Sequence, residues 1–449
     1  MNEPVAIVGL SCRFPGGDDP EAFHRALLDD APRFLPPPRE RWAWCAQDGV
    51  RVPRVGRLDD PLGFDCARFR ISPREAETMD PHQRLMLEEA LRALEDAGWD
   101  PDTVRGRAIG VFVAVYAQDF QLHARDGAWD EISRLYLATG SAHSVVPNRI
   151  SYVLDLRGPS EVVDTACSSG LVALHRAVAA IQAGECAQAL VGGVSLLLEP
   201  SRIVRLQELG LLAPDGCCSP FDAGSRGQVL GEGVGALVLK PLAAALRDGD
   251  RVRAIVRGTG VNHQGARSGG LTRPSAAAQA ELIRRVHDRD AIDPGEVGYV
   301  EAHGNGGTGD AIELLAFQEI YPSGIPVGSV KGHIGFLEAA GGISQLVKVV
   351  GAIDAGVMPG TAGHARLLEA EGLRPDSCRI LREATPLDAL ARPGAPFTAG
   401  VHAYGLGGCN AHVVLAAPSQ EIRVAARRPA REPTPLRRRR FPLPEVRGS

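Results

Sequence analysis

Short apolar runs bounded by glycine, proline or polar residues recur along the whole chain. Runs of this kind are typical of buried β-strands. The run at residues 231–239 begins with alternating glycines, but no strand and helix bracket it in the way a dinucleotide site requires. We predict strands at residues 5–10, 108–115, 162–163, 189–198, 231–239, 253–258, 297–301, 327–331 and 411–415.

Apolar residues at helical spacing lie between these runs. Leucines between residues 85 and 94 predict an amphipathic helix that ends at Gly98. Apolar residues between 171 and 178 predict a second helix, which Gly184 closes. Residues 31–64 are rich in Pro, Arg and Trp and lack periodicity, so we predict a long surface loop there. Strands that alternate with helices predict an α/β fold.

Composition narrows the class of protein. The chain has 449 residues, of which 44% are hydrophobic, enough for one large domain or two closely packed halves. Its net charge of −5 gives no general attraction to nucleic acid. No window approaches the roughly 18 apolar residues of a membrane span, and the start lacks a signal-peptide pattern. We therefore expect a cytoplasmic protein that binds neither nucleic acid nor a membrane.

One of the nine cysteines has an unusual position. The nine are scattered without a C-x-x-C pair, which predicts reduced thiols and no metal centre. Cys167, however, lies between the strand at 162–163 and the helix near Leu171. There a thiol faces unpaired backbone N–H groups and the positive end of the helix dipole, which favour thiolate and can bind an oxyanion. We predict a nucleophile; the alternative is a small buried cysteine.

The segment around Cys167 also carries a family resemblance. Residues 164–169 read Asp-Thr-Ala-Cys-Ser-Ser and resemble the nucleophile signature of β-ketoacyl synthases in their modular polyketide synthase form. The resemblance runs from about residue 5 to about residue 415. It implies a thiolase-like fold, with two similar halves in five αβαβα layers. Further matching stretches, in family order, are residues 3–9, 79–81, 158–160, 301–304 and 410–414.

The resemblance also implies a domain organisation and partners. It places an N-terminal half with the nucleophile at residues 1–255, a C-terminal half with the histidine loops at 256–416, and an Arg/Pro-rich tail at 417–449. It implies a homodimer and a thioester substrate on the phosphopantetheine of an acyl or peptidyl carrier protein, with no other cofactor. The tail is interpreted as a linker lying on the body, or alternatively as a docking segment for an acidic carrier protein.

In the family that the chain resembles, two histidines donate to the malonyl thioester oxygen, where enolate charge develops, and a lysine supports them. By the resemblance, His303 is the first of these histidines and Lys331 is the lysine, with Asp310 and Glu338 in support. The alternative for His303 is a strand-end histidine that bonds a loop. The loop at residues 305–308 is one residue shorter than in the family and lacks its first Thr.

The main departure from the family follows Lys331. The family reads Lys-Ser-Asn-Ile-Gly-His, whereas residues 331–336 read Lys-Gly-His-Ile-Gly-Phe. Phe336 therefore replaces the second catalytic histidine of the family, and its side chain can neither donate a hydrogen bond nor titrate. Because the loss of one oxyanion donor costs about 10²–10³ in rate, we expect decarboxylative extension to be weakened or replaced.

His333 stands where the family has Asn and leaves two interpretations open. It either fills space or joins Cys167 and His303 in a different acid–base set, with Phe336 lining the acyl chain. Such a set suits a substrate that contains its own pro-nucleophile. Deprotonation between two carbonyls and intramolecular attack would then form a ring.

The glycine-rich loop at residues 401–410 departs from the family as well. Leu406 stands at the gate position, and its N–H is expected to share the oxyanion hole with that of Cys167. Tyr404 and His402 are new polar groups near the site. Tyr404 alternatively replaces a Phe with its hydroxyl bonded locally, and we assign no role to His402.

We predict a ketosynthase-type acyltransferase of polyketide or mixed polyketide–peptide biosynthesis. It forms an acyl-Cys167 intermediate and then makes a C–C bond by intramolecular cyclisation or a modified condensation. The alternatives are a non-elongating transacylase and an inert partner subunit of a heterodimer. The presence of Cys167, His303 and Lys331 argues against the inert subunit. The sequence leaves the acyl substrate and the product open.

Overall fold

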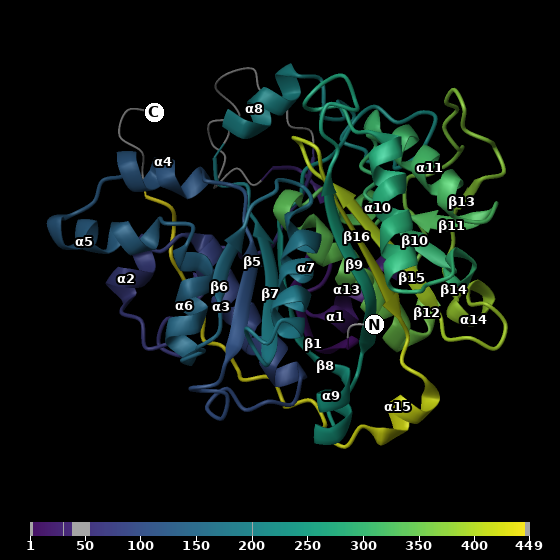
Figure 1. Cartoon of the computed structure of the whole chain (residues 1–449). Helices are drawn as coiled ribbons and strands as arrows, with labels where there is room; N and C mark the ends of the chain where they lie inside the picture. The colour runs from purple at the N-terminus through teal and green to yellow at the C-terminus, as the bar shows by residue number, and fades with distance from the viewer. Residues whose placement is uncertain (1–2, 30, 38–53, 200, 445–449) are drawn as a thin grey trace.

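The computed structural model describes residues 3–29, 31–37, 54–199 and 201–444. One sheet of eleven strands runs through the molecule in the order β13-β11-β10-β15-β16-β9-β1-β8-β7-β5-β6 (Figure 1). The N-terminal half contributes β1 (Val5–Arg13), β5 (Ile109–Ala114), β6 (Ser160–Val163), β7 (Gln188–Ser195) and β8 (Gly233–Pro241). The C-terminal half contributes β9 (Ala254–His263), β10 (Tyr299–Glu301), β11 (Ile325–Gly328), β13 (Cys378–Ile380), β15 (Thr398–Tyr404) and β16 (Cys409–Ala416).

The two halves of the sheet repeat one pairing pattern. In the N-terminal half β1, β8 and β7 pair antiparallel, and β5 and β6 continue in parallel. In the C-terminal half β9, β16 and β15 pair antiparallel, and β10 and β11 continue in parallel. Strands β1 and β9 pair with each other and join the halves. This duplication confirms the two similar halves that the resemblance implied.

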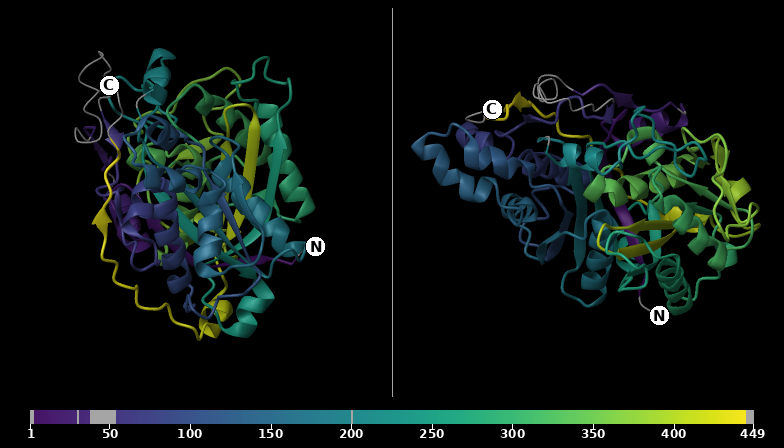
Figure 2. Two further views of the ribbon diagram at one scale, coloured as in Figure 1. Left: turned by 90° about the vertical axis from the view of Figure 1, so that its left-hand side faces the viewer. Right: turned by 90° about the horizontal axis from the view of Figure 1, so that it is seen from above.

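Helices form three layers around these strands (Figures 1 and 2). Helix α3 (Pro81–Asp96) covers the outer face of the N-terminal strands, and α10 (Ala276–Arg289) with α11 (Gly309–Ile320) covers the C-terminal strands. Helices α7 (Ser169–Gln182) and α13 (Gly341–Ala355) pack against each other between the two halves, where the largest apolar core lies. The predicted thiolase-like α/β fold in five layers is confirmed.

The other elements of the described chain are shorter. The remaining helices are α1 (Pro20–Leu28), α2 (Pro73–Thr78), α4 (Asp119–Asp126), α5 (Glu131–Gly140), α6 (Val145–Leu154), α8 (Ser201–Glu208), α9 (Leu242–Asp248), α12 (Lys331–Ile334), α14 (Leu387–Leu390) and α15 (Gln420–Ala425). Two-residue strands are β2 (Phe34–Leu35), β3 (Val55–Gly56), β4 (Gly63–Phe64), β12 (Val357–Met358), β14 (Thr385–Pro386) and β17 (Arg439–Arg440).

Most predicted elements are present, with two corrections. The strand predicted to reach residue 331 ends at Gly328, and Lys331 instead begins α12. The described part of the predicted surface loop at 31–64 contains the β2–β3 pair, and Val55 and Phe64 are fully buried. Apolar side chains there pack on the body, although the segment lacks periodicity. Residues 38–53 of that loop lie outside the described residues.

The tail after residue 416 lies along the body, as its first interpretation predicted. In Figures 1 and 2 the yellow segment runs from α15 along the N-terminal half. Strand β17 pairs with β4, and the guanidinium of Arg428 forms an ion pair with Asp250. The Phe441 side chain is 1% exposed. In the described part of the chain, no helix has the length and apolar character to cross a membrane.

Candidate active site

Three segments that follow parallel strands come together. The turn after β6 carries Cys167, the loop after β10 carries His303, and the segment after β11 carries Lys331 and Phe336. Because the carboxyl ends of parallel strands lie at one edge of each half-sheet, these side chains converge although they are far apart in the sequence. The structure therefore brings together segments that carry three of the predicted site residues, Cys167, His303 and Lys331.

The turn before Cys167 holds a strained backbone. Ala166 has φ +54°, in the left-handed region that residues other than glycine rarely adopt. Its N–H donates to Asp164 Oδ1 at 3.0 Å, and the Thr165 N–H donates to the Ser169 hydroxyl at 2.8 Å. Side chains on both sides of Ala166 thus hold the bent conformation that presents Cys167 at the start of α7.

The Cys167 sulfur lies in a mainly apolar setting. Burial raises the pKa of the thiol to about 11, against hydrogen bonding from the Leu406 N–H and from its own N–H, which lowers it. The backbone N–H groups thus favour thiolate as expected, but desolvation outweighs them and the net pKa is raised. The structure does bring the two N–H groups predicted for the oxyanion hole to the sulfur.

Gly405 allows the Leu406 N–H to come this close. A Cβ at Gly405 would lie 2.3 Å from the Thr165 carbonyl oxygen and 3.1 Å from the Ser168 hydroxyl. Only glycine fits this contact between the loop and the nucleophile turn. The Leu406 side chain is 57% exposed.

His303 is held through its backbone by α11 and Lys331. Its N–H donates to Glu313 Oε1 at 2.7 Å, and the Gly304 N–H donates to Oε2 at 2.9 Å. The Lys331 ammonium donates to the His303 carbonyl oxygen. Burial lowers the pKa of the His303 imidazole far below its ordinary value, and the charge of Lys331 lowers it further. The ring is therefore neutral near pH 7 and can accept a proton.

The shortened loop after His303 is fully braced. Asp310 accepts hydrogen bonds from the N–H groups of Asn305 at 3.0 Å and Gly306 at 3.1 Å. Burial raises the pKa of Asp310 to about 6 although these bonds lower it. The Ser329 hydroxyl donates to the Gly304 carbonyl at 2.6 Å. The Asp310 carboxylate thus holds the backbone of the loop after His303.

Two aromatic rings flank the His303 ring. The Phe336 ring meets it edge-on with centroids 5.3 Å apart, and the Tyr404 ring lies at 4.2 Å. The Lys331 ammonium is 5.5 Å from the centre of the Phe336 ring. Phe336 belongs to an apolar cluster against which Cys167 packs. The position of the second family histidine therefore presents an apolar face to the site.

His333 is not part of this group. It is fully buried on the side of α12 that faces α1, and its carbonyl accepts the Arg33 N–H at 2.6 Å. Burial lowers the pKa of its imidazole to about 3, with smaller effects from Lys348 and Arg33. The structure thus separates His333 from Cys167 and His303, which contradicts its prediction as a catalytic residue and favours the space-filling interpretation.

Glu338 is held by a residue that the sequence reasoning missed. Arg202 on α8 forms ion pairs with Glu338 at 2.6 Å and with Asp119 at 3.3 Å. Glu338 itself has φ +46°, and burial raises the pKa of its carboxyl. No local pattern in the sequence links α8 to Glu338. For Glu313 a signal existed, because it lies one helical turn after Asp310.

His402 lies behind His303 rather than in the site. Its side chain is fully buried, with ring centroids 5.7 Å from Phe317 and 5.6 Å from His412. Burial lowers the pKa of His402 to about 3. In the described ranges no cluster of three His, Cys, Asp or Glu side chains is arranged to hold a metal ion.

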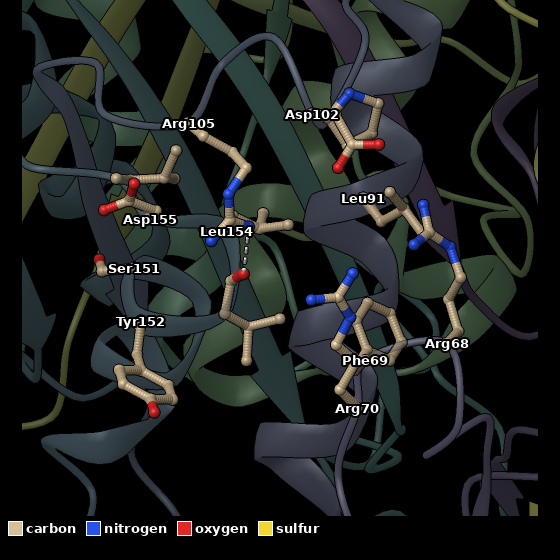
Figure 3. Close-up of a pocket in the computed structure, with 13 residues that line it drawn as sticks. Arg68, Phe69, Arg70, Leu91, Asp102, Arg105, Ser151, Tyr152, Leu154 and Asp155 are labelled. Atoms are coloured by element: carbon tan, nitrogen blue, oxygen red, sulfur yellow. Dashed lines mark hydrogen bonds between the residues drawn. The ribbon is translucent and has the colours of Figure 1, made fainter.

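An open hollow of about 630 Å³ lies elsewhere on the molecule (Figure 3). Arg68, Arg70 and Arg105 line it, and Arg105 donates to the Val153 carbonyl at 3.0 Å. Its walls include the end of α6 and the segment before β5, so it is at the amino ends of β5 and β6. Cys167 follows the carboxyl end of β6, and the hollow is therefore separate from the site.

Comparisons with known proteins agree with this geometry. The description "Beta-ketoacyl synthase, N-terminal domain" matches residues 2–245, and "Beta-ketoacyl synthase, C-terminal domain" matches residues 253–364. The polyketide synthase ThaG of Burkholderia thailandensis is 44% identical over 430 residues, which are 92% of this chain but 8% of that protein. The highly reducing polyketide synthase ausV of Aspergillus calidoustus is 40% identical over 431 residues, which are 92% of this chain and 17% of that protein. The chain thus spans only a small part of the length of these relatives.

Solved structures give the same result. The ketosynthase from module 6 of the bacillaene synthase of Bacillus subtilis 168 has a TM-score of 0.85 at 34% identity, over 93% of this chain and 72% of its own. The oxazolomycin ketosynthase domain OzmH KS7 of Streptomyces albus JA3453 has a TM-score of 0.84 at 36% identity, over 93% and 75%. The chain therefore belongs to the β-ketoacyl synthase family and is a ketosynthase of the polyketide synthase type.

Proposed function

We propose that this ketosynthase takes an acyl group onto Cys167 and then forms a C–C bond by a route that needs one histidine instead of two. The substrate's own carbanion attacks the thioester, or a modified condensation takes place. The observation that carries the proposal is Phe336, whose ring lies edge-on to His303 at 5.3 Å where the family has its second histidine.

The first step uses Cys167 and its two backbone donors. Because the pKa of the thiol is about 11, the sulfur must lose a proton as it attacks. The neutral His303 is suited to accept that proton, since its Nδ1 has no hydrogen-bond partner among the described residues. The N–H groups of Cys167 and Leu406 then stabilise the tetrahedral oxyanion.

The second step differs from ordinary extension. Malonyl decarboxylation places charge on a thioester oxygen and is fastest with donors aimed at that oxygen. Phe336 donates nothing, and Lys331 is already bonded to the His303 carbonyl. A carbanion flanked by two carbonyls needs less help, because its charge is delocalised within the substrate. This difference favours a substrate that already contains its pro-nucleophile.

A single-turnover experiment tests the proposal. The protein is acylated with hexanoyl pantetheine, and the adduct on Cys167 is confirmed by intact mass. Malonyl-loaded carrier protein is then added and both masses are followed. We expect the hexanoyl group to stay on Cys167 without loss of carbon dioxide. Ordinary extension of the carrier-bound malonyl unit would overturn the proposal, and transfer of the intact acyl group to unloaded carrier would favour a transacylase.

We further propose that the substrate arrives on the phosphopantetheine of a carrier protein.

We also propose that the chain forms a homodimer. Strand β6 ends the sheet, so its outer backbone groups have no strand neighbour among the described residues. Such an edge can pair with a second copy of itself. Sedimentation velocity at micromolar concentration tests the dimer, and a monomer would overturn it.

A further inference from the structure

We propose that the Tyr404 hydroxyl donates a hydrogen bond to an oxygen of a β-dicarbonyl substrate beside His303, and so supplies the donor that Phe336 lacks. This inference rests on the proposed function and names the substrate class that the same site would take. It makes Tyr404 more than a replacement for an aromatic residue of the family.

The fold fixes Tyr404 between the nucleophile turn and His303. Strand β15 ends at Tyr404, and the next residue, Gly405, touches the Thr165 carbonyl closely enough that no side chain fits there. The Tyr404 ring lies 4.2 Å from the His303 ring at an angle of 40°. Cys167 packs on the cluster that contains Phe336, whose ring meets His303, and Cys167 also contributes to the raised pKa of Tyr404. A group bonded to the Cys167 sulfur is therefore expected to lie near Tyr404 and His303.

The Tyr404 hydroxyl is not engaged by another group of the described chain. It forms no hydrogen bond within the described part of the chain, although the residue is half-buried. It lies beside Gly309 at the start of α11, where a Cβ would come within 2.2 Å of the hydroxyl oxygen. Burial, then Glu313 and Asp310, raise the pKa of Tyr404 well above its ordinary value, so the hydroxyl keeps its proton.

Other polar side chains near the site have different contacts. The Lys331 ammonium is bonded to the His303 carbonyl oxygen. The His402 ring is fully buried and packs against Phe317 and His412. His333 lies on the side of α12 that faces α1, close to Arg33. Tyr404 is thus the polar side chain whose position next to His303 suits a donor.

The proton and electron pairs balance in this step. The two carbonyls lie further along the acyl chain that is bound to Cys167 as a thioester. His303 takes the proton from the carbon between them, and the electron pair of that C–H bond moves into an enolate whose oxygen accepts a hydrogen bond from the Tyr404 hydroxyl. The enolate carbon then attacks the Cys167 thioester carbonyl. A C–C bond forms, the C–S bond breaks, and the departing thiolate takes the proton back from His303.

Deuterium exchange measures the donor directly. The probe is 2-methyl-3-oxobutanoyl pantetheine in D2O, and NMR follows loss of the C2 proton above the buffer rate. We expect Tyr404→Phe to slow the catalysed exchange about 10²-fold at unchanged KM, because one enolate donor is lost. Acylation of Cys167 by hexanoyl pantetheine should keep its rate. Tyr152→Phe, which removes an exposed hydroxyl far from Cys167, is the matched control.

The outcomes separate this inference from the proposed function. Exchange at the same rate in Tyr404→Phe and the unaltered protein overturns the role of Tyr404 and leaves the proposed function standing. No catalysed exchange in the unaltered protein overturns the proposed carbanion chemistry and, with it, the role of Tyr404. A parallel loss of Cys167 acylation in Tyr404→Phe would indicate a structural role and also overturn the inference.

Discussion

At the residue scale, His303 has aromatic neighbours at its ring and charged neighbours at its backbone. Phe336 and Tyr404 flank its ring, while Glu313 and Lys331 hold its backbone. The His303 ring is thereby fixed in place, but the two aromatic rings that flank it are uncharged. Its chemistry depends on the neutral imidazole and on whichever donor stands beside it, so single substitutions at the two aromatic positions should have separable effects.

Restoring the family histidine should restore ordinary extension. In Phe336→His a ring donor would face His303 and the Cys167 sulfur, so we expect malonyl decarboxylation to rise about 10²-fold or more. Release of carbon dioxide from malonyl-loaded carrier measures it. His333→Asn, which restores the other family residue on the far side of α12, should leave the rate unchanged. Equal rates in Phe336→His and the unaltered protein would contradict this account of Phe336.

The raised pKa of Cys167 predicts a pH profile for alkylation. Because the pKa is about 11, the thiolate fraction rises tenfold per pH unit through the neutral and mildly alkaline range. The rate constant for iodoacetamide, measured by intact mass, should therefore increase log-linearly from pH 7 to pH 10. A plateau below pH 8 would mean that the backbone N–H groups of Leu406 and Cys167 outweigh burial.

At the scale of elements, the spacing of apolar residues along the chain was the basis for predicting secondary structure. Strand β5 and helix α3 lie within a few residues of the predicted ranges, because their patterns follow directly from burial. Strand β11 ends early because the chain turns after Gly328: Val330 donates its N–H to Glu301 and Lys331 donates its N–H to the Ser329 hydroxyl. These contacts involve polar side chains, which the spacing of apolar residues does not reveal.

The site was predictable only in part. Cys167 and His303 could be located, because a turn after an apolar strand is visible in the sequence and the family motif lies there. Arg202 could not, because its contact with Glu338 joins segments more than a hundred residues apart. The direction of His333 depends on the helical turn of α12, which brings its ring to Leu27 of α1 while Lys331 reaches the His303 carbonyl. Spacing along a predicted loop does not reveal that turn.

A buried histidine column in the C-terminal half predicts acid sensitivity. His402, His412 and His287 follow one another with ring centroids 5.6 and 6.0 Å apart. Burial lowers the pKa of all three, and that of His402 to about 3. Between pH 3 and 6.5 the unfolded chain therefore binds protons that the folded chain does not, so stability is full above pH 6.5 and falls as the pH is lowered.

Urea unfolding of His402→Phe measures this effect. Lowering the pH from 7.5 to 5.0 should cost the unaltered protein about 2 kcal/mol more than the variant, because one titrating group is removed. Phe keeps a ring of similar size against Phe317. The same pH dependence in both proteins would show that His402 is not held neutral in the fold.

At the scale of the whole molecule, the tail ties the C-terminus to the N-terminal half. The Phe441 N–H donates to the Leu62 carbonyl at 3.0 Å, and Arg84 donates to the Phe441 carbonyl at 3.3 Å. Arg438 pairs with Glu88 at 2.8 Å. Part of the basic charge of the tail is thus used within the chain, which leaves less of it to bind an acidic carrier protein.

Truncating the buried anchor of the tail should destabilise the protein. We expect Phe441→Ala to lower the free energy of unfolding by about 3–5 kcal/mol, because a fully buried ring leaves a cavity. Val424→Ala, at a tail position that is 74% exposed, is the matched control and should change it by no more than about 0.5 kcal/mol. Chemical unfolding at pH 7.5 measures both. If Phe441→Ala unfolds at the same urea concentration as Val424→Ala, the tail rests on the body without stabilising it, and its arginines are free to serve a partner instead.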